Sequence, residues 1–75
     1  MATRKVNQQR LTFKQLETDF YKLSGRDQES YMNDAAIILY EMPFDLAVQS
    51  AESEDLIDEV FANVRKKAIL LSAAA

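Results

Sequence analysis

Only one glycine and one proline interrupt this chain of 75 residues. Glycine and proline are the residues that most often end regular structure, so their scarcity favours a few long, uninterrupted segments. Within those segments the apolar residues recur every three or four positions, which is typical of amphipathic helices. The sequence therefore predicts an all-α fold: a small three-helix domain over residues 11–75, preceded by a flexible basic arm over residues 1–10.

The first helix is predicted to begin at Thr12, whose side chain can cap the first turn. Gln15 lies three residues further on and completes a capping box with Thr12. The apolar residues that follow are spaced by three, four and three positions, so they share one helical face: Phe13, Leu16, Phe20 and Leu23. Gly25 is predicted to end this helix in the left-handed conformation that glycine adopts without strain.

The second helix is predicted over residues 27–42, with Asp27 as its N-cap and Pro43 as the residue that stops it. Its expected buried stripe consists of Tyr31, Ala35, Ile38 and Met42, widened by Ile37 and Leu39. The pattern leaves two alternatives for residues 44–51. They form either a short helical turn or the first part of a long third helix.

Ser53 is the stronger start for the third helix, because Glu54 and Asp55 then fill the first turn. Residues 65–67, all cations, lie toward its other end, and both placements suit the helix dipole. The apolar stripe of this helix is broad enough to face both a core and a second chain: Leu56, Ile57, Val60, Phe61, Val64, Ala68 and Leu71.

Charge is segregated along the chain. Ten acidic residues and no lysine or arginine lie between residues 27 and 64, whereas residues 1–26 are basic on balance. The net charge of the whole chain is −3. The acidic middle is expected to attract a basic partner surface and to repel phosphate.

Small size and composition favour self-association. A chain of this length buries only about 60% of the surface that its unfolded form exposes, so its core is marginal. Small domains commonly add disulfides, a metal or a partner chain. The absence of cysteine excludes disulfides and thiolate metal sites, and the absence of histidine removes the commonest transition-metal ligand. Oligomerisation is the remaining common route to stability, and we expect a homodimer.

The third helix predicts how that homodimer forms. It has no acid–base pair four residues apart, because its acids occupy one end and its bases the other. Two copies packed antiparallel would bring unlike charges together around a two-fold axis. The predicted interface consists of Ile57, Val60, Phe61, Val64, Leu71, Asp58, Glu59, Arg65, Lys66 and Lys67. The alternative is intramolecular, with the basic end of this helix lying against the acidic second helix.

The residues that carry enzyme chemistry are scarce. Asp55, Asp58 and Glu59 share one helical face, as hard cations such as Ca²⁺ or Mg²⁺ would require. However, no glycine-containing calcium loop accompanies them, and a chain with one glycine cannot form a phosphate loop. We therefore interpret the acidic cluster, which also includes Glu52 and Glu54, as a solvated face. The sequence predicts no catalytic residue, no metal site and no cofactor.

Nucleic-acid binding is the main alternative function. A helix-turn-helix centred on Gly25 is excluded, because its recognition helix would be acidic. Gly25-Arg26-Asp27 followed by Tyr31-Met32-Asn33-Asp34-Ala35 resembles the second half of the ribbon-helix-helix family, over about half of the chain. The resemblance implies a strand at residues 4–11, helices at residues 12–24 and 27–42, and a dimeric DNA-binding regulator. Arg4, Gln8 and Arg10 would then read the bases, although neither face of residues 4–11 is apolar, as a two-stranded ribbon requires.

These observations favour a non-enzymatic protein–protein interaction module that binds an unidentified protein through an acidic and apolar helical surface. Phe44 and Leu46 are surplus apolar residues that a partner could contact. The size is typical of accessory or regulatory proteins of bacteria, phages or plasmids. The sequence has no apolar run of the ~20 residues that a membrane span needs, and no apolar segment follows residues 1–5, so neither a membrane span nor a signal peptide is expected, and we expect a cytoplasmic location. Residues 70–75 resemble the small apolar tails that bacterial energy-dependent proteases recognise, although a frayed helix end is the simpler interpretation.

Overall fold

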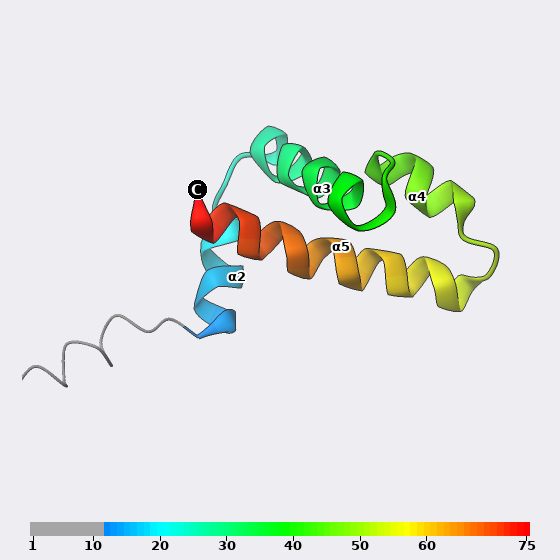
Figure 1. The fold of residues 1–75 in the computed structure, drawn as a ribbon. Helices are drawn as coiled ribbons and strands as arrows, with labels where there is room; N and C mark the ends of the chain where they lie inside the picture. Colours follow the sequence, from blue (N-terminus) through cyan, green and yellow to red (C-terminus); the bar gives the residue numbers. More distant parts are fainter. Residues whose placement is uncertain (1–11) are drawn as a thin grey trace, which may run out of the picture.

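The computed structural model describes residues 12–75, and this part of the chain is 83% helix with no strand. Four helices follow one another: α2 (Phe13–Tyr21), α3 (Gly25–Tyr40), α4 (Phe44–Ser50) and α5 (Glu54–Ala74) (Figure 1). The all-α prediction is confirmed. The segment for which two alternatives stood open is a separate helix, because Ala51 is extended and ends α4 before Ser53 begins α5.

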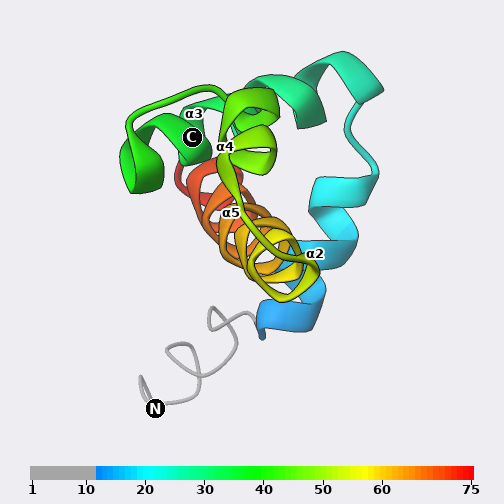
Figure 2. The same cartoon turned by 90° about the vertical axis from the view of Figure 1, so that its right-hand side faces the viewer.

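The longest helix, α5, is the centre of the fold. Helix α3 runs antiparallel along it, and α4 covers its N-terminal half (Figure 1). Helix α2 packs against the C-terminal half of α5 from another side (Figure 2). Because α2, α3 and α4 each pack on α5, its apolar residues are shared among three neighbours.

The core is small and rich in alanine. Its buried residues are Phe20, Ala35, Ala36, Ala47, Val60, Val64, Ala68 and Ile69. Alanine lets two helices approach closely but removes little apolar area from water at each position. Several larger apolar side chains consequently remain at the surface of the described chain.

The start of α2 is as predicted, whereas the junction with α3 is not. The Thr12 hydroxyl accepts from the Gln15 backbone N–H at 3.2 Å, and the Gln15 side chain accepts from the Thr12 N–H at 3.1 Å. The prediction that Gly25 ends this helix in a left-handed conformation is wrong, because Gly25 is the first residue of α3. Ser24, not Asp27, is the N-cap of α3, since its hydroxyl accepts from the Asp27 N–H at 3.1 Å.

Helix α3 ends earlier than the proline suggested. Its last residue is Tyr40, and Glu41 takes the left-handed conformation with φ of 61°. Pro43 is the N-cap of α4 and has no side-chain oxygen to cap the helix. The N–H of Phe44 donates instead to Asn33 Oδ1 at 3.0 Å, so a side chain of α3 caps α4.

The predicted stripe of α3 is partly wrong. Ile37 and Ile38 are 50% and 55% exposed, and the buried residues of this helix are Ala35 and Ala36. The sequence pattern assumed that the largest apolar residues of α3 face the core. In the structure the buried side of α3 instead carries the small side chains of Ala35 and Ala36, and α4 and α5 both pack on this helix. The start of α5 is confirmed, because the Ser53 hydroxyl accepts from the Leu56 N–H at 3.2 Å.

Candidate interaction surface

The apolar residues predicted for an α5 interface lie mainly in the core of the single chain. Val60 and Val64 are 8% and 0% exposed, Ile57 is half-buried, and Leu71 packs against the core. Phe61 is 41% exposed. In this conformation the two valines have little surface to offer a second chain. An interface on α5 would therefore rely on its exposed residues.

The charged residues of that prediction lie at the surface of α5. Glu59 and Lys66 are exposed and Lys67 is half-buried, while Asp58 and Arg65 are also exposed. Within residues 12–75 one ion pair is present, between Lys22 Nζ and Asp19 Oδ1 at 3.9 Å. No described acid of α3 therefore pairs with the basic end of α5, as the intramolecular alternative would require.

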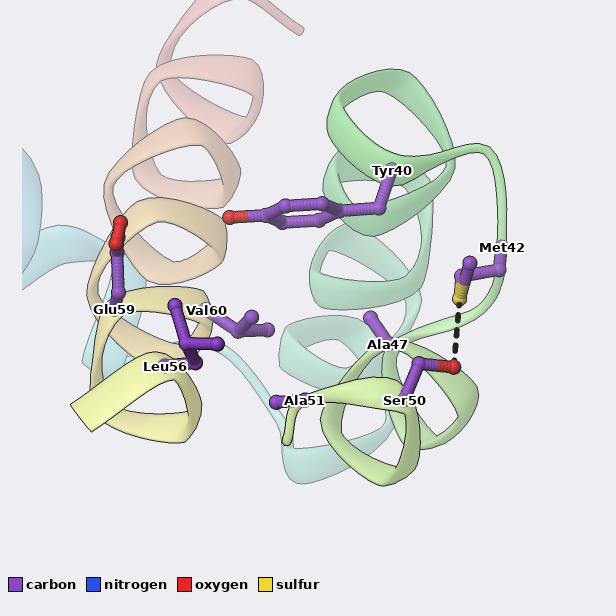
Figure 3. A pocket seen from close by; sticks show the side chains of 8 residues that line it. All are labelled: Tyr40, Met42, Ala47, Ser50, Ala51, Leu56, Glu59 and Val60. Carbon is purple, nitrogen blue, oxygen red and sulfur yellow. Dashed lines mark hydrogen bonds between the residues drawn. The ribbon is translucent and has the colours of Figure 1, made fainter. Parts of the chain in front are cut away.

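A depression opens between α4 and the N-terminal half of α5, with a volume of about 240 Å³ (Figure 3). We call it the α4–α5 depression, and it is lined by Tyr40, Met42, Ala47, Ser50, Ala51, Leu56, Glu59 and Val60. The Tyr40 ring reaches from α3 toward α5, and the Ser50 hydroxyl donates to the Met42 sulfur at 3.6 Å (Figure 3). Glu59 is the one acidic residue of this mostly apolar lining.

A second depression, of about 290 Å³, continues along the same side of α5. This α3–α5 depression is lined by Leu39, Tyr40, Asn63, Lys66, Lys67 and Leu70. Tyr40 borders both depressions, and its hydroxyl accepts from Asn63 Nδ2 at 3.1 Å. The two depressions adjoin at Tyr40, and we call the pair the track; it is acidic at Glu59 and basic at Lys66 and Lys67.

The outer side of α3 carries a third apolar surface. A depression of about 370 Å³ is lined by Tyr31, Asp34, Ile37, Ile38 and Leu71, and we call it the outer α3 depression. Its two isoleucines are the most exposed of the large apolar residues in the described chain. Its one charged lining residue is the acid Asp34.

The two residues predicted as partner contacts have different surroundings. Phe44 packs edge-on against Phe61, with ring centroids 5.0 Å apart, and lies against the core. Leu46 is 49% exposed on α4. Leu46 is thus available to a partner, whereas Phe44 already has one within the chain.

The acidic cluster at the start of α5 is exposed throughout: Glu52, Glu54, Asp55, Asp58 and Glu59. Across residues 12–75 no three acidic side chains are grouped so that they could hold a metal ion. None of the four described helices combines the length and the apolar character needed to cross a membrane.

The predictions for the N-terminal residues fall outside the part of the chain that the structure describes, whereas those for the C-terminal residues fall inside it. Arg4, Gln8 and Arg10, the proposed base readers, lie outside the described residues. At the other end α5 continues to Ala74, with Ile69 buried and Leu71 half-buried. Residues 70–74 are helical and Leu71 packs against the core, which does not support a frayed end at residues 70–72, whereas residues 73–75 are exposed.

Several residues of the track were not assigned to a site from the sequence: Leu39, Tyr40, Leu56, Asn63 and Leu70. The spacing of residues 56, 59, 63, 66 and 70 is a sequence signal that could have identified the α5 part of it. Comparison of the chain with protein-family models, curated proteins and solved structures found no match. The surfaces described above therefore carry the functional proposal.

Proposed function

We propose that this protein is a non-enzymatic helical interaction module that forms a homodimer and binds another protein. The observation that supports it is the distribution of large apolar side chains. Nine of them are 40% to 55% exposed in the described chain, whereas half of the buried core residues are alanines. Apolar patches of this kind on a soluble protein typically mark interaction sites.

The proposal assigns a separate surface to each kind of contact. The second copy contacts the exposed side of α5, where unlike charges lie at the two ends of the track. The other protein contacts the outer α3 depression and, on α4, the exposed Leu46.

The chemistry of the α3 surface defines the partner. Ile37 and Ile38 offer apolar area, and Asp34 lies beside them. Asp34 is the one charged residue that lines the depression, and α3 carries no cation after Arg26. A partner segment with apolar side chains flanked by lysine or arginine fits this surface, because charge complementarity steers encounter and excludes acidic competitors. Such a module acts as an accessory or regulatory protein, since its effect is exerted through the partner that it holds.

The first prediction concerns this partner surface. A tagged full-length chain is used for pull-down with and without nuclease, and bound proteins are identified by mass spectrometry. The variant Ile37→Ser/Ile38→Ser is expected to lose the bound protein, because the exposed apolar area is removed while the core is untouched. Tyr21→Ser is the matched control, since Tyr21 is 49% exposed on α2, away from this surface.

Two results would contradict the proposed partner binding. One is equal retention of the bound protein by the α3 variant and by the control. The other is a bound fraction that disappears on nuclease treatment, which would favour the DNA-binding alternative based on residues 4–11. The homodimer is tested separately, because light scattering that finds a monomer at micromolar concentration excludes it.

A further inference from the structure

Five exposed residues form a straight strip along α5: Leu56, Glu59, Asn63, Lys66 and Leu70. We call this strip the α5 edge. Successive members are three, four, three and four residues apart, so they lie within about 80° around the helix. This is the spacing with which one helix presents a seam to another. All five also line the track between α5 and the helices α3 and α4: Leu56 and Glu59 border its acidic end, and Asn63, Lys66 and Leu70 border the rest.

The α5 edge is complementary to itself when its direction is reversed about Asn63. Reversal brings Leu56 to the level of Leu70, and it brings Glu59 to the level of Lys67, next to Lys66. Asn63 then faces its own equivalent. A two-fold axis produces this relation, because each contact occurs twice with the partners exchanged.

We infer that a second copy of this chain docks antiparallel on the α5 edge, with the two-fold axis at Asn63. The inference rests on the homodimer of the proposed function and specifies its geometry. Leu70 of the second copy reaches the level of Leu56, which borders the α4–α5 depression of about 240 Å³ opposite Met42 (Figure 3). The depression thus receives an apolar side chain from the second copy.

Charge selects the orientation of the second copy. In the antiparallel arrangement Glu59 lies beside Lys66 and Lys67 of the second copy, twice per dimer. The described chain holds no ion pair that already neutralises these three residues. A parallel arrangement about the same edge would instead place Glu59 against Glu59, which is repulsive.

The apolar ends and the central amide select the register. A shift of three or four residues would set Leu70 against Glu59 or Leu56 against Lys66, so an apolar side chain would cover a charge. Asn63 donates one amide hydrogen to Tyr40, and its second amide hydrogen and its carbonyl oxygen remain for the equivalent Asn63. A polar residue at such a seam position fixes register in helical dimers.

Disulfide trapping tests this geometry in the full chain, which has no cysteine of its own. Asn63→Cys is expected to cross-link with itself, because the axis passes through this position. Leu56→Cys alone is not expected to do so, since its two copies lie about 21 Å apart along the helices and a disulfide needs Cα atoms within about 7 Å. A mixture of Leu56→Cys and Leu70→Cys is expected to yield the mixed disulfide. Ala62→Cys is the control, because this exposed position lies one residue from the axis but about 100° around the helix.

Each outcome bears on one claim. Cross-linking of Asn63→Cys and of the mixed pair, with little from Leu56→Cys or Ala62→Cys, supports the inference. Self-linking of Leu56→Cys, or linking of Ala62→Cys as fast as Asn63→Cys, overturns the antiparallel geometry. If light scattering still finds a dimer in that case, the homodimer of the proposed function is retained. A monomer in light scattering of the unmodified chain overturns both. Circular dichroism of each variant confirms that the helices are retained.

Discussion

At the scale of single residues, Asn33 shows how one side chain can hold two helices together. It lies half-buried on α3, and its side-chain oxygen accepts the hydrogen bond of the Phe44 N–H at 3.0 Å. The N-cap of α4 is a proline, which cannot supply that oxygen itself. The first turn of α4 therefore depends on α3 for its cap, and the sequence around residue 44 contains no sign of it.

Asn33→Ala is expected to lower the free energy of unfolding by about 1–3 kcal/mol, because the Phe44 N–H then loses its partner in a partly buried place. Urea unfolding followed by circular dichroism measures the change. Asn33→Asp is the matched control, since a carboxylate keeps the acceptor and suits a helix N-terminus. An equal loss in both variants would show that the hydrogen bond is not the cause.

At the scale of elements, α3 is the helix whose boundaries depart most from the sequence pattern. It begins at Gly25, where an added Cβ would meet no atom within 4 Å and φ is not positive. It ends at Tyr40, followed by Glu41 in the left-handed region, which favours glycine. Glycine, which adopts the left-handed conformation without strain, thus lies at the start of α3, where that conformation is absent. Glu41, for which the left-handed conformation is unfavourable, lies at its end.

The two boundaries of α3 predict that stability increases when glycine is removed at its start and when glycine is introduced after its end. Gly25→Ala is expected to raise the free energy of unfolding by about 0.5–1 kcal/mol, because alanine restricts the unfolded chain and fits the first turn of α3. Glu41→Gly is expected to raise it by a similar amount, about 0.5–1 kcal/mol, by relieving the left-handed backbone. Thermal and urea unfolding of the two variants check this. Destabilisation by Gly25→Ala would instead support a left-handed glycine that ends α2.

At the scale of the whole molecule, the central position of α5 decides which surfaces are free. Three helices cover parts of α5 (Figures 1 and 2), and the five residues of the α5 edge are exposed. Ile37 and Ile38 of α3 are also exposed, and the depression that they line borders Leu71 of α5. The molecule therefore offers two distinct apolar surfaces, one with both signs of charge and one with an acid alone.

Charge-reversal substitutions on the α5 edge test the antiparallel dimer through its dissociation constant. Glu59→Lys should weaken dimerisation at least about tenfold, because it places like charges together twice. The triple exchange Glu59→Lys/Lys66→Glu/Lys67→Glu should restore it, since unlike charges then meet again. Sedimentation equilibrium at low salt gives the dissociation constants, and the difference should shrink in about 1 M NaCl, where the Debye length is about 3 Å. Failure of the triple variant to recover would contradict the antiparallel arrangement.

Local signals in the sequence predicted much of the fold. Thr12 with Gln15 and Ser53 with the acids after it place the starts of α2 and α5, because capping depends on residues within one turn. Helical periodicity predicted the all-α class. Of the residues predicted for the α5 interface, the charged ones lie at the surface, whereas Val60 and Val64 belong to the core.

The sequence by itself determined the all-α class, the starts of α2 and α5 and the separation of charge along the chain, since these depend on neighbours within a few positions. Only the tertiary structure decided which side of each helix is covered. Alanines of α3 and valines of α5 fill the core because close helix packing favours small and branched side chains there, and this leaves Ile37, Ile38 and the α5 edge outside. An amphipathic pattern states that a helix has an apolar side, but the number of neighbours determines how much of that side is buried.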